Sequence, residues 1–270
     1  MGEDALEQAV PRSEDPRLLK GGGRYIDDMV LPDMAFGYVL RSPHAHAKIR
    51  SLDSDAAKAA PGVLAVIDGA DWKANEFGDM PVGGGRTQRD GSPLYQPPFP
   101  ALVRDRVRWV GDYVAFIVAE SLNQAKDATD AAFAKADHVV REKFVINRVT
   151  GATMEPRSCI GQYTASEDHY TIYTTLQQTH PYRATLARVV LNVPENKVRV
   201  VTGDVGGSFG MKSEMYNEVA LVLYGSKVAG RPVKWTSDRS ESFVSDAHGA
   251  TMSPSESWRS TKTAIFSASG

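Results

Sequence analysis

Cysteine is nearly absent from this sequence, which has 270 residues and a single cysteine, Cys159. One cysteine excludes an internal disulfide bond. It also excludes an iron–sulfur cluster held by this chain alone, because such clusters need several thiolate ligands. We expect Cys159 to be a small core residue, the usual role of a free cysteine. Long apolar runs are missing too, and no segment approaches the roughly 18 to 20 apolar residues of a membrane helix.

An excess of charge of either sign is also missing. The chain has 31 Lys and Arg against 33 Asp and Glu, so nothing in the composition points to nucleic acid or a membrane surface as a partner. The acidic N-terminus, residues 1–7, lacks the apolar core of a signal peptide, and we expect a cytoplasmic protein. With 42% hydrophobic residues the chain can form a sizeable core, and its length suits two modest domains.

Strand-like and helix-like segments are interspersed along the chain. The apolar patterns predict strands at 36–40, 47–52, 63–67, 114–119, 139–146, 170–173 and 197–201, the last one buried. They predict helices at 53–60, 122–136, 181–191 and 213–228, with Asp53 as a candidate N-cap of the first. Residues 78–100, rich in Gly and Pro, are expected to form a long irregular excursion. This order predicts mixed α and β layers without an internal repeat.

The most informative segment is Val-Thr-Gly-Asp-Val-Gly-Gly-Ser-Phe-Gly-Met-Lys at 201–212. It lies between a predicted strand and a predicted helix. A glycine-rich turn in that place presents free backbone N–H groups, and the helix dipole adds partial positive charge, so the turn favours an anion or an oxo ligand. The spacing matches neither of the two common phosphate loops. By itself the segment is equally compatible with a tight turn that only packs a helix onto a strand.

Further motifs accompany this loop along the chain. In order they are Arg12-Ser-Glu-Asp-Pro-Arg-Leu-Leu19, Gly23-Arg-Tyr-Ile-Asp-Asp28, Arg41-Ser-Pro-His-Ala-His-Ala-Lys-Ile49, Asp105-Arg-Val-Arg-Trp-Val-Gly111, Met154-Glu-Pro-Arg157, the run 177–188, the glycine loop and Val233-Lys-Trp-Thr-Ser-Asp-Arg-Ser-Glu241. Together, over roughly residues 10 to 249, they resemble the molybdopterin-binding large subunit of the xanthine dehydrogenase/aldehyde oxidase family. The resemblance is closest to the branch that includes the large chain of aerobic carbon monoxide dehydrogenase.

The resemblance implies an α+β fold with two parts. An a/b hammerhead domain would span residues 10–130, and the first part of a molybdopterin-cofactor-binding α/β domain would span 131–249. The hammerhead's last strand and the linker after it are expected to be missing, because 125–130 runs directly into a segment that resembles the opening of the cofactor domain. An unpaired sheet edge would follow.

Residues 250–270 lie outside the resemblance. Codons allowed for 250–266, read two bases later, can spell a sequence with alternating apolar residues and an Asp-Gly turn, which is a hairpin signature. We hypothesise that this tail is a frameshift product. The alternative is a divergent or disordered tail, and the coding DNA distinguishes the two.

The resemblance also implies cofactor contacts. Gln177 matches a glutamine that hydrogen-bonds an oxygen on molybdenum, with Gln178 as the competing candidate, and an amide can donate there without carrying charge. Three loop residues, Gly207, Phe209 and Gly210, match the family's cofactor loop, in which a backbone N–H would donate to the apical oxygen and the Phe ring would exclude water.

Two loop positions depart from the family's pattern. Ser208 stands where Gly is usual, and Met211 where Gly or Asn is common, which makes Met211 less suited to close backbone approach. Nearby, we expect Glu155 and Arg157 to form an ion pair or an interface clamp with a structural role.

The remaining polar and aromatic candidates are expected to be structural. The segment Asp238-Arg-Ser-Glu241 should form a turn that satisfies its own charges. His44 and His46 are expected at a surface or turn, because no cysteine or carboxylate with zinc-site spacing lies near them in the sequence. Both Trp109 and Trp235 are expected in the core. No residue of the chain is predicted to be a metal ligand.

The resemblance further implies a function. Family members oxidise a carbon centre, or carbon monoxide, with oxygen from water, on a molybdenum–molybdopterin cofactor that in some members is the cytosine dinucleotide form. Electrons leave through a small 2Fe-2S subunit and a medium FAD-binding subunit, in a dimer of heterotrimers. The family's general-base glutamate would lie beyond the end of this chain. We therefore assign no catalytic residue, expect this fragment alone to be inactive, and leave the substrate open among carbon monoxide, an aldehyde, a purine and another heterocycle. The alternative is a non-catalytic assembly or interaction module that retains the fold but has lost the active site.

Overall fold

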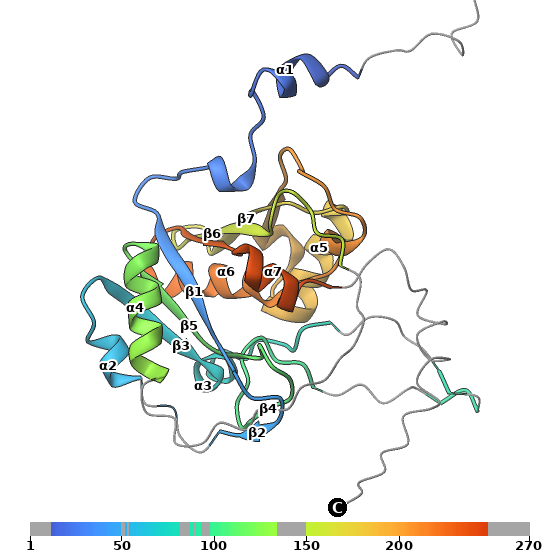
Figure 1. The fold of residues 1–270 in the computed structure, drawn as a ribbon. Helices are drawn as coiled ribbons and strands as arrows, with labels where there is room; N and C mark the ends of the chain where they lie inside the picture. Colours follow the sequence, from blue (N-terminus) through green and yellow to red (C-terminus); the bar gives the residue numbers. More distant parts are fainter. Residues whose placement is uncertain are drawn as a thin grey trace, which may run out of the picture.

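The computed structural model describes residues 12–49, 52, 54–81, 87–88, 90–92, 98–133 and 150–247. The strand predicted at 139–146 and the tail at 250–270 lie outside these residues. The junction after residue 130, where the linker is expected to be missing, lies within one helix, α4 (Leu122–Phe133). The prediction of an α+β fold is confirmed, since helices pack on both faces of one large sheet (Figure 1).

Within the described residues the main sheet has seven strands in the order β3-β5-β1-β9-β6-β7-β8. Their bounds are β1 Ala35–Arg41, β3 Val63–Asp68, β5 Tyr113–Ala119, β6 Ser158–Thr164, β7 His169–Thr174, β8 Val198–Val201 and β9 Val233–Thr236. A second, small sheet pairs β2 (Ala47–Lys48) with β4 (Arg106–Val107). Of the strand predicted at 47–52, Ala47 and Lys48 form a strand, whereas Ile49 and Leu52 do not.

The pairing of β1 with β9 joins an early and a late segment of the chain in one sheet. Strand β1 pairs with β5 antiparallel on one side and with β9 parallel on the other, where Ala35 lies opposite Val233. The N-terminal strands β3, β5 and β1 thus continue directly into the later strands β9, β6, β7 and β8. In the described part of the chain β3 and β8 are the two edge strands.

The helices are short except for two. They are α1 Asp15–Leu19, α2 Asp55–Lys58, α3 Gly69–Ala74, α4 Leu122–Phe133, α5 Thr179–Thr185, α6 Asn217–Ala229 and α7 Arg239–Ser245, with a π-helix η2 at Leu186–Leu191 and 3-10 turns η1 (Ile26–Asp28), η3 (Glu195–Lys197) and η4 (Met211–Ser213). The sequence suggested Asp53 as the N-cap of α2, but the N-cap residue is Ser54. No helix in the described ranges combines the length and apolar character that a membrane crossing requires.

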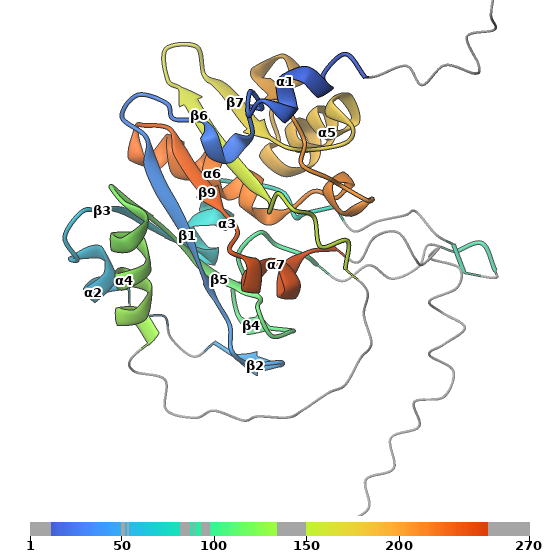
Figure 2. The same ribbon diagram turned by 45° about the horizontal axis from the view of Figure 1, so that its top comes forward.

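The alternation of β5 explains why helices cover both faces. Phe116 and Val118 belong to the core cluster that includes α6, whereas Ala115, Ile117 and Ala119 belong to a second cluster with residues of α2 and α4. Successive strand residues point to opposite faces, so one apolar strand supplies both cores. Figure 2 shows α4 on one side of β1 and β5, and α6 on the other.

Helix α6 packs against β6 with almost no space between their backbones. A Cβ atom added at Gly161 of β6 would lie 2.6 Å from the backbone carbonyl of Val222 in α6. Only glycine allows this approach, because any side chain would overlap helix backbone. The close contact fixes the helix whose N-terminal end follows the glycine loop.

Several local predictions were wrong and others are confirmed. The 197–201 strand is an edge strand in which only Val198 is fully buried, because among the described strands β8 pairs with β7 alone. Trp109 is 40% exposed, whereas Trp235 and Cys159 are buried as predicted. The predicted helix at 213–228 begins at Asn217, after η4 and an extended Glu214.

Candidate functional site

The glycine loop runs from the end of β8 to η4 in an unusual backbone conformation. Gly207, Phe209 and Gly210 have φ values of +97°, +51° and +87°. Glycine adopts this left-handed region easily, but a non-glycine residue there is uncommon and marks local strain, which is typical of functional sites. The Phe209 side chain is 62% exposed, so the loop presents an aromatic ring to its surroundings.

Gly207 makes room for that ring. A Cβ atom at this position would lie 3.0 Å from Cε2 of Phe209 and 3.5 Å from Cγ2 of Thr153. The Phe209 ring therefore lies against the backbone of Gly207, and a side chain at 207 would displace the ring and also strain the positive φ. The three residues predicted from the loop motif thus form one compact unit.

Glu155 anchors the loop at both ends. Its Oε2 accepts a hydrogen bond of 2.7 Å from the Gly206 N–H and another of 2.7 Å from Nζ of Lys212. The Lys212 side chain is buried, which lowers its pKa, while the carboxylate of Glu155 opposes that shift. The ion pair predicted between Glu155 and Arg157 does not form, because each of them has partners from segments distant in the sequence.

Gln177 lies beside the same loop. Its backbone N–H donates to the carbonyl oxygen of Lys212 at 3.3 Å, and Oγ of Ser213 donates to its Oε1. The side chain is exposed, and its amide nitrogen has no hydrogen-bond partner among the described residues. Gln178, the competing candidate, is the N-cap residue of α5. The structure therefore brings Gln177 and the loop together, through residues 212 and 213.

Two buried polar atoms close to the loop lack a partner among the described residues. They are Oγ of Ser208 and Oε1 of Glu155. Buried polar atoms are normally hydrogen-bonded, so an unpaired one points to a missing ligand or water. The free amide of Gln177 and the exposed Phe209 add a neutral donor and an apolar cover. The Ser208 hydroxyl and the Gln177 amide can donate, and they fit a cofactor with several oxygen acceptors, whereas Oε1 of Glu155 can only accept and does not contribute to that fit.

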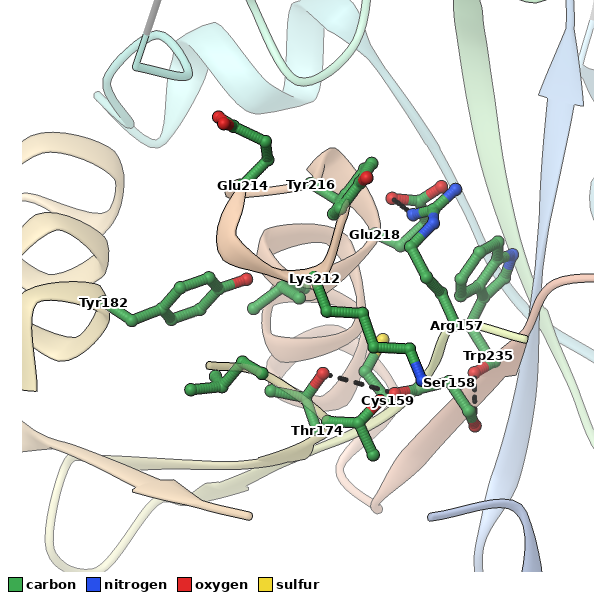
Figure 3. A pocket seen from close by; sticks show the side chains of 13 residues that line it. Arg157, Ser158, Cys159, Thr174, Tyr182, Lys212, Glu214, Tyr216, Glu218 and Trp235 are labelled. Atoms are coloured by element: carbon green, nitrogen blue, oxygen red, sulfur yellow. Dashed lines mark hydrogen bonds and ion pairs between the residues drawn. The ribbon is translucent and has the colours of Figure 1, made fainter. Parts of the chain in front are cut away.

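A buried network of charged side chains surrounds Arg157, which follows Glu155 by two residues. Arg157 donates to Oδ1 of Asp246 at 2.7 Å, to Oε2 of Glu218 at 3.0 Å and to Oγ of Ser245 at 2.7 Å. Its guanidinium also stacks 3.7 Å above the ring of Tyr216. Figure 3 shows the Arg157 and Glu218 heads side by side above Trp235. The segment that leads into β6 is thereby tied to α6 and α7.

A second arginine completes this network. Arg41 of β1 donates to Oε1 of Glu241 at 2.7 Å and to Oε1 of Glu218 at 3.1 Å, and Tyr113 donates to the same Glu218 oxygen. Burial would raise the pKa of Glu218, but Arg157 and Arg41 outweigh it and the pKa is lowered. For Glu241 burial prevails over Arg41, and its pKa is raised. These charges tie β1, α6 and α7 together.

The 238–241 segment differs from its prediction. Asp238 caps α7 by accepting from the Glu241 N–H at 2.7 Å, as a local turn would. Arg239, however, donates to the carbonyl oxygens of Thr153 and Met154 at 2.7 and 2.9 Å, and Glu241 pairs with Arg41. The charges of Arg239 and Glu241 are therefore satisfied by distant segments, and Asp238 has its partner within the turn.

A small cavity separates this network from α5. Its volume is about 20 Å³, and Cys159, Tyr182 and Lys212 line it (Figure 3). Thr175 also belongs to the lining. That space holds about one water molecule. The Thr175 hydroxyl has no partner among the described residues, which suits a bound water. The cavity is too small for a substrate.

Histidines give no indication of a metal centre in the described residues. Nε2 of His46 lies 3.3 Å from Nη1 of Arg106, and His46 is exposed. The described parts of the chain contain no group of three or more His, Cys, Asp or Glu side chains that could hold a metal ion.

The sequence reasoning missed Lys212, Glu218 and Arg41 as parts of the site's support. One signal was available for Glu218. It precedes the apolar run Val-Ala-Leu-Val-Leu at 219–223, and an ionisable residue beside such a run has to find a partner when it is buried.

Comparisons with known proteins agree with this geometry. The family described as "Molybdopterin cofactor-binding domain" matches residues 115–255, and "Aldehyde oxidase and xanthine dehydrogenase, a/b hammerhead domain" matches residues 20–137. The carbon monoxide dehydrogenase large chain of Afipia carboxidovorans is 32% identical, over 89% of this chain and 36% of the relative. The nicotine 6-hydroxylase large subunit of Paenarthrobacter nicotinovorans is 30% identical, over 91% and 35%.

Solved structures give the same result. Quinoline 2-oxidoreductase from Pseudomonas putida 86 superposes with a TM-score of 0.76 at 32% identity, over 87% of this chain and 35% of that one. The chain spans about a third of the length of the curated relatives it matches. The glycine loop and the matched family descriptions lead to one assignment: the chain belongs to the molybdopterin cofactor-binding family of the xanthine dehydrogenase and aldehyde oxidase type.

Proposed function

We propose that this chain supplies one wall of the molybdenum–molybdopterin site in the large subunit of a molybdenum hydroxylase. The observation that carries the proposal is the loop 206–210, strained at Phe209 and bound through Lys212 and Ser213 to Gln177. When bound, the cofactor supplies two-electron oxidation of a carbon centre with oxygen from water. The chain's own part is to bind and orient that group.

Three contacts would carry out this binding. The amide nitrogen of Gln177 would donate to an oxygen on the metal without adding charge. Backbone N–H groups at Gly207 and Gly210 would donate from a loop whose glycines allow close approach. Phe209, with its exposed ring, would cover the group and exclude water. A water-excluded site strengthens each hydrogen bond made inside it.

Other parts of the site belong outside this chain in our proposal. The relatives are about three times longer, and we place the general-base glutamate and the rest of the cofactor pocket in the part that this chain does not span. The hammerhead part would occupy 10–130 and the opening of the cofactor domain 131–249. The cofactor would be molybdopterin, with the cytosine dinucleotide form as a finer proposal, and the protein would be cytoplasmic.

The proposed chemistry also requires an exit for electrons. Its single cysteine prevents this chain from holding an iron–sulfur cluster by itself. We therefore propose a small 2Fe-2S subunit and a medium FAD-binding subunit as partners, assembled as a dimer of heterotrimers when the large subunit is full length. The genes for the two partners should lie near the gene for this chain. A genomic neighbourhood that lacks both genes would contradict the oxidoreductase proposal.

The cofactor content of the purified chain tests the central part. The chain is produced in a host that makes the molybdenum cofactor, purified without oxygen, and analysed for molybdenum and pterin per chain. We expect less than one pterin per chain, because part of the pocket is not in this chain. Gly207→Ala should carry several-fold less, since the new Cβ displaces Phe209.

Gly230→Ala is the matched control. Gly230 also has a positive φ, +68°, but a Cβ there meets nothing within 4 Å, and the residue ends α6 away from the loop. It should carry as much pterin as the unmodified chain. Equal pterin in all three proteins, or none in the unmodified chain, would favour the alternative of a non-catalytic assembly module.

A further inference from the structure

We propose that Glu155 and Lys212 are positioning residues that hold the glycine loop and Gln177 in one fixed arrangement. The role of the loop as a cofactor contact rests on the proposed function, but the mechanical coupling between these segments does not. Neither residue was predicted to act on the loop, and neither is itself placed against the cofactor.

A single oxygen atom joins the two ends of the loop. Oε2 of Glu155 accepts from the Gly206 N–H at its start and from Nζ of Lys212 at its end, each at 2.7 Å. The Glu155 N–H donates back to the Gly206 carbonyl at 3.2 Å. Five residues separate the two anchored positions, and they include all three loop residues of the candidate site.

Lys212 extends the coupling to Gln177. The carbonyl oxygen of Lys212 accepts from the Gln177 N–H, and the next residue, Ser213, donates to the Gln177 side chain. The two groups proposed to contact the cofactor thus meet at consecutive residues, 212 and 213. A shift of Lys212 would move both together.

The turn that carries Glu155 is itself held by hydrogen bonds from α7. Arg239 of α7 donates to the carbonyl oxygens of Thr153 and Met154, and Oγ1 of Thr153 donates to the carbonyl oxygen of Glu155. Side chains that must hold a site precisely need such support from a second layer of hydrogen bonds. The contact chain runs from α7 through the 153–155 turn to the loop.

Burial makes this pair hard to break. The side chains of Lys212 and Glu155 are 1% and 9% exposed. Removing one partner would leave a buried charge uncompensated, which is far less favourable than keeping both. A buried, two-point attachment therefore restricts the loop more than a surface ion pair does.

Amide hydrogen exchange in the full cofactor-free chain tests the coupling. The informative amides are those of Gly206, Met211 and Gln177, which donate to Glu155, Ser208 and Lys212. In Glu155→Ala we expect exchange at Gly206 to rise by about tenfold or more, with a smaller rise at Gln177, while β5 is unchanged. Glu155→Gln retains an acceptor for Gly206 and should give an intermediate effect.

Glu195→Gln is the matched control, because Glu195 also pairs with two cations, Arg183 and Arg188, but away from the loop. It should leave loop exchange unchanged. If Glu155→Ala does not fold, the neutral double variant Glu155→Gln/Lys212→Met provides the test. It should melt close to the unmodified chain and still show faster exchange at Gln177.

A second readout separates this proposal from the proposed function. If the unmodified chain carries pterin, Glu155→Ala should lose it and Glu155→Gln should recover part of it. If no pterin is found, the proposed function fails, and the exchange result alone decides the coupling. Loop exchange that is unchanged in Glu155→Ala, or raised equally across β5, would overturn the coupling.

Discussion

Arg157 and Glu218 form an ion pair of 3.0 Å inside the protein, with side chains 6% and 1% exposed. Glu218 lies in the first turn of α6, where the helix dipole favours a negative charge. Arg41 reaches the same carboxylate from β1. The pair therefore stands where the N-terminal and the later strands of the sheet meet, and it links them electrostatically.

Replacing Glu218 should destabilise the fold strongly. Glu218→Gln removes the carboxylate and leaves two buried arginines less compensated, and we expect a loss of about 3 to 5 kcal/mol in the free energy of unfolding. Urea unfolding followed by tryptophan fluorescence measures this. Glu195→Gln, which breaks more exposed pairs, should cost about 1 kcal/mol or less. Similar losses in the two variants would show that the buried network contributes little.

The contribution of Glu218 should also depend on pH. Its pKa in the folded protein is lowered from the ordinary value of 4.5, so its stabilisation is fully present above that value and is lost as the pH falls below it. The difference in unfolding free energy between the unmodified chain and Glu218→Gln should therefore be constant from pH 7 to pH 6 and narrow below about pH 4.5. A difference that widens with acid would contradict the sign of this shift.

Gly161→Ala should be among the most damaging small substitutions. The added Cβ would lie 2.6 Å from the backbone carbon and oxygen of Val222, and neither atom can move without shifting α6. We expect a loss of about 3 kcal/mol or more, comparable to severe overpacking of a core. Thermal unfolding measures it. Gly230→Ala is the control, and a Gly161→Ala protein that melts no lower than this control would show that β6 and α6 are farther apart.

The single thiol should be unreactive in the folded protein. Cys159 is buried, and burial raises its pKa well above the usual range, so little thiolate forms and reagents cannot reach it. A thiol reagent should titrate no cysteine under native conditions and one per chain in denaturant. Fast modification of the native protein would place Cys159 outside the core.

The glycine loop could be recognised in the sequence because a tight turn needs particular residue types at fixed spacing. Gly207 and Gly210 take the positive φ that glycine allows. Gln177 was singled out by the family resemblance alone, and its contact with the cofactor stays a prediction. The neighbouring β6 was not predicted. Its sequence, Ser-Cys-Ile-Gly-Gln-Tyr-Thr, shows no clear alternation, because the strand is central and its first four residues are buried on both faces.

The supporting contacts could not be read from the sequence for a different reason. Glu155 and Arg157 were paired because they are neighbours of opposite charge. The fold instead brings Lys212 to Glu155 and Glu218 to Arg157, across 57 and 61 residues. Local spacing contains no information on such partners. Trp109 was predicted in the core for a similar reason, because an aromatic residue beside a strand can be buried or, as here, partly exposed.

A structure of the cofactor-loaded protein tests the central claim most directly. The account predicts the metal group beside the loop, with the Gln177 amide nitrogen and a backbone N–H of residues 207–210 each within hydrogen-bond distance of its oxygens, and the Phe209 ring over it. Such a structure would also show whether Ser208 Oγ gains a partner. A cofactor bound elsewhere, with Gln177 and the loop contacting only solvent, would contradict the account.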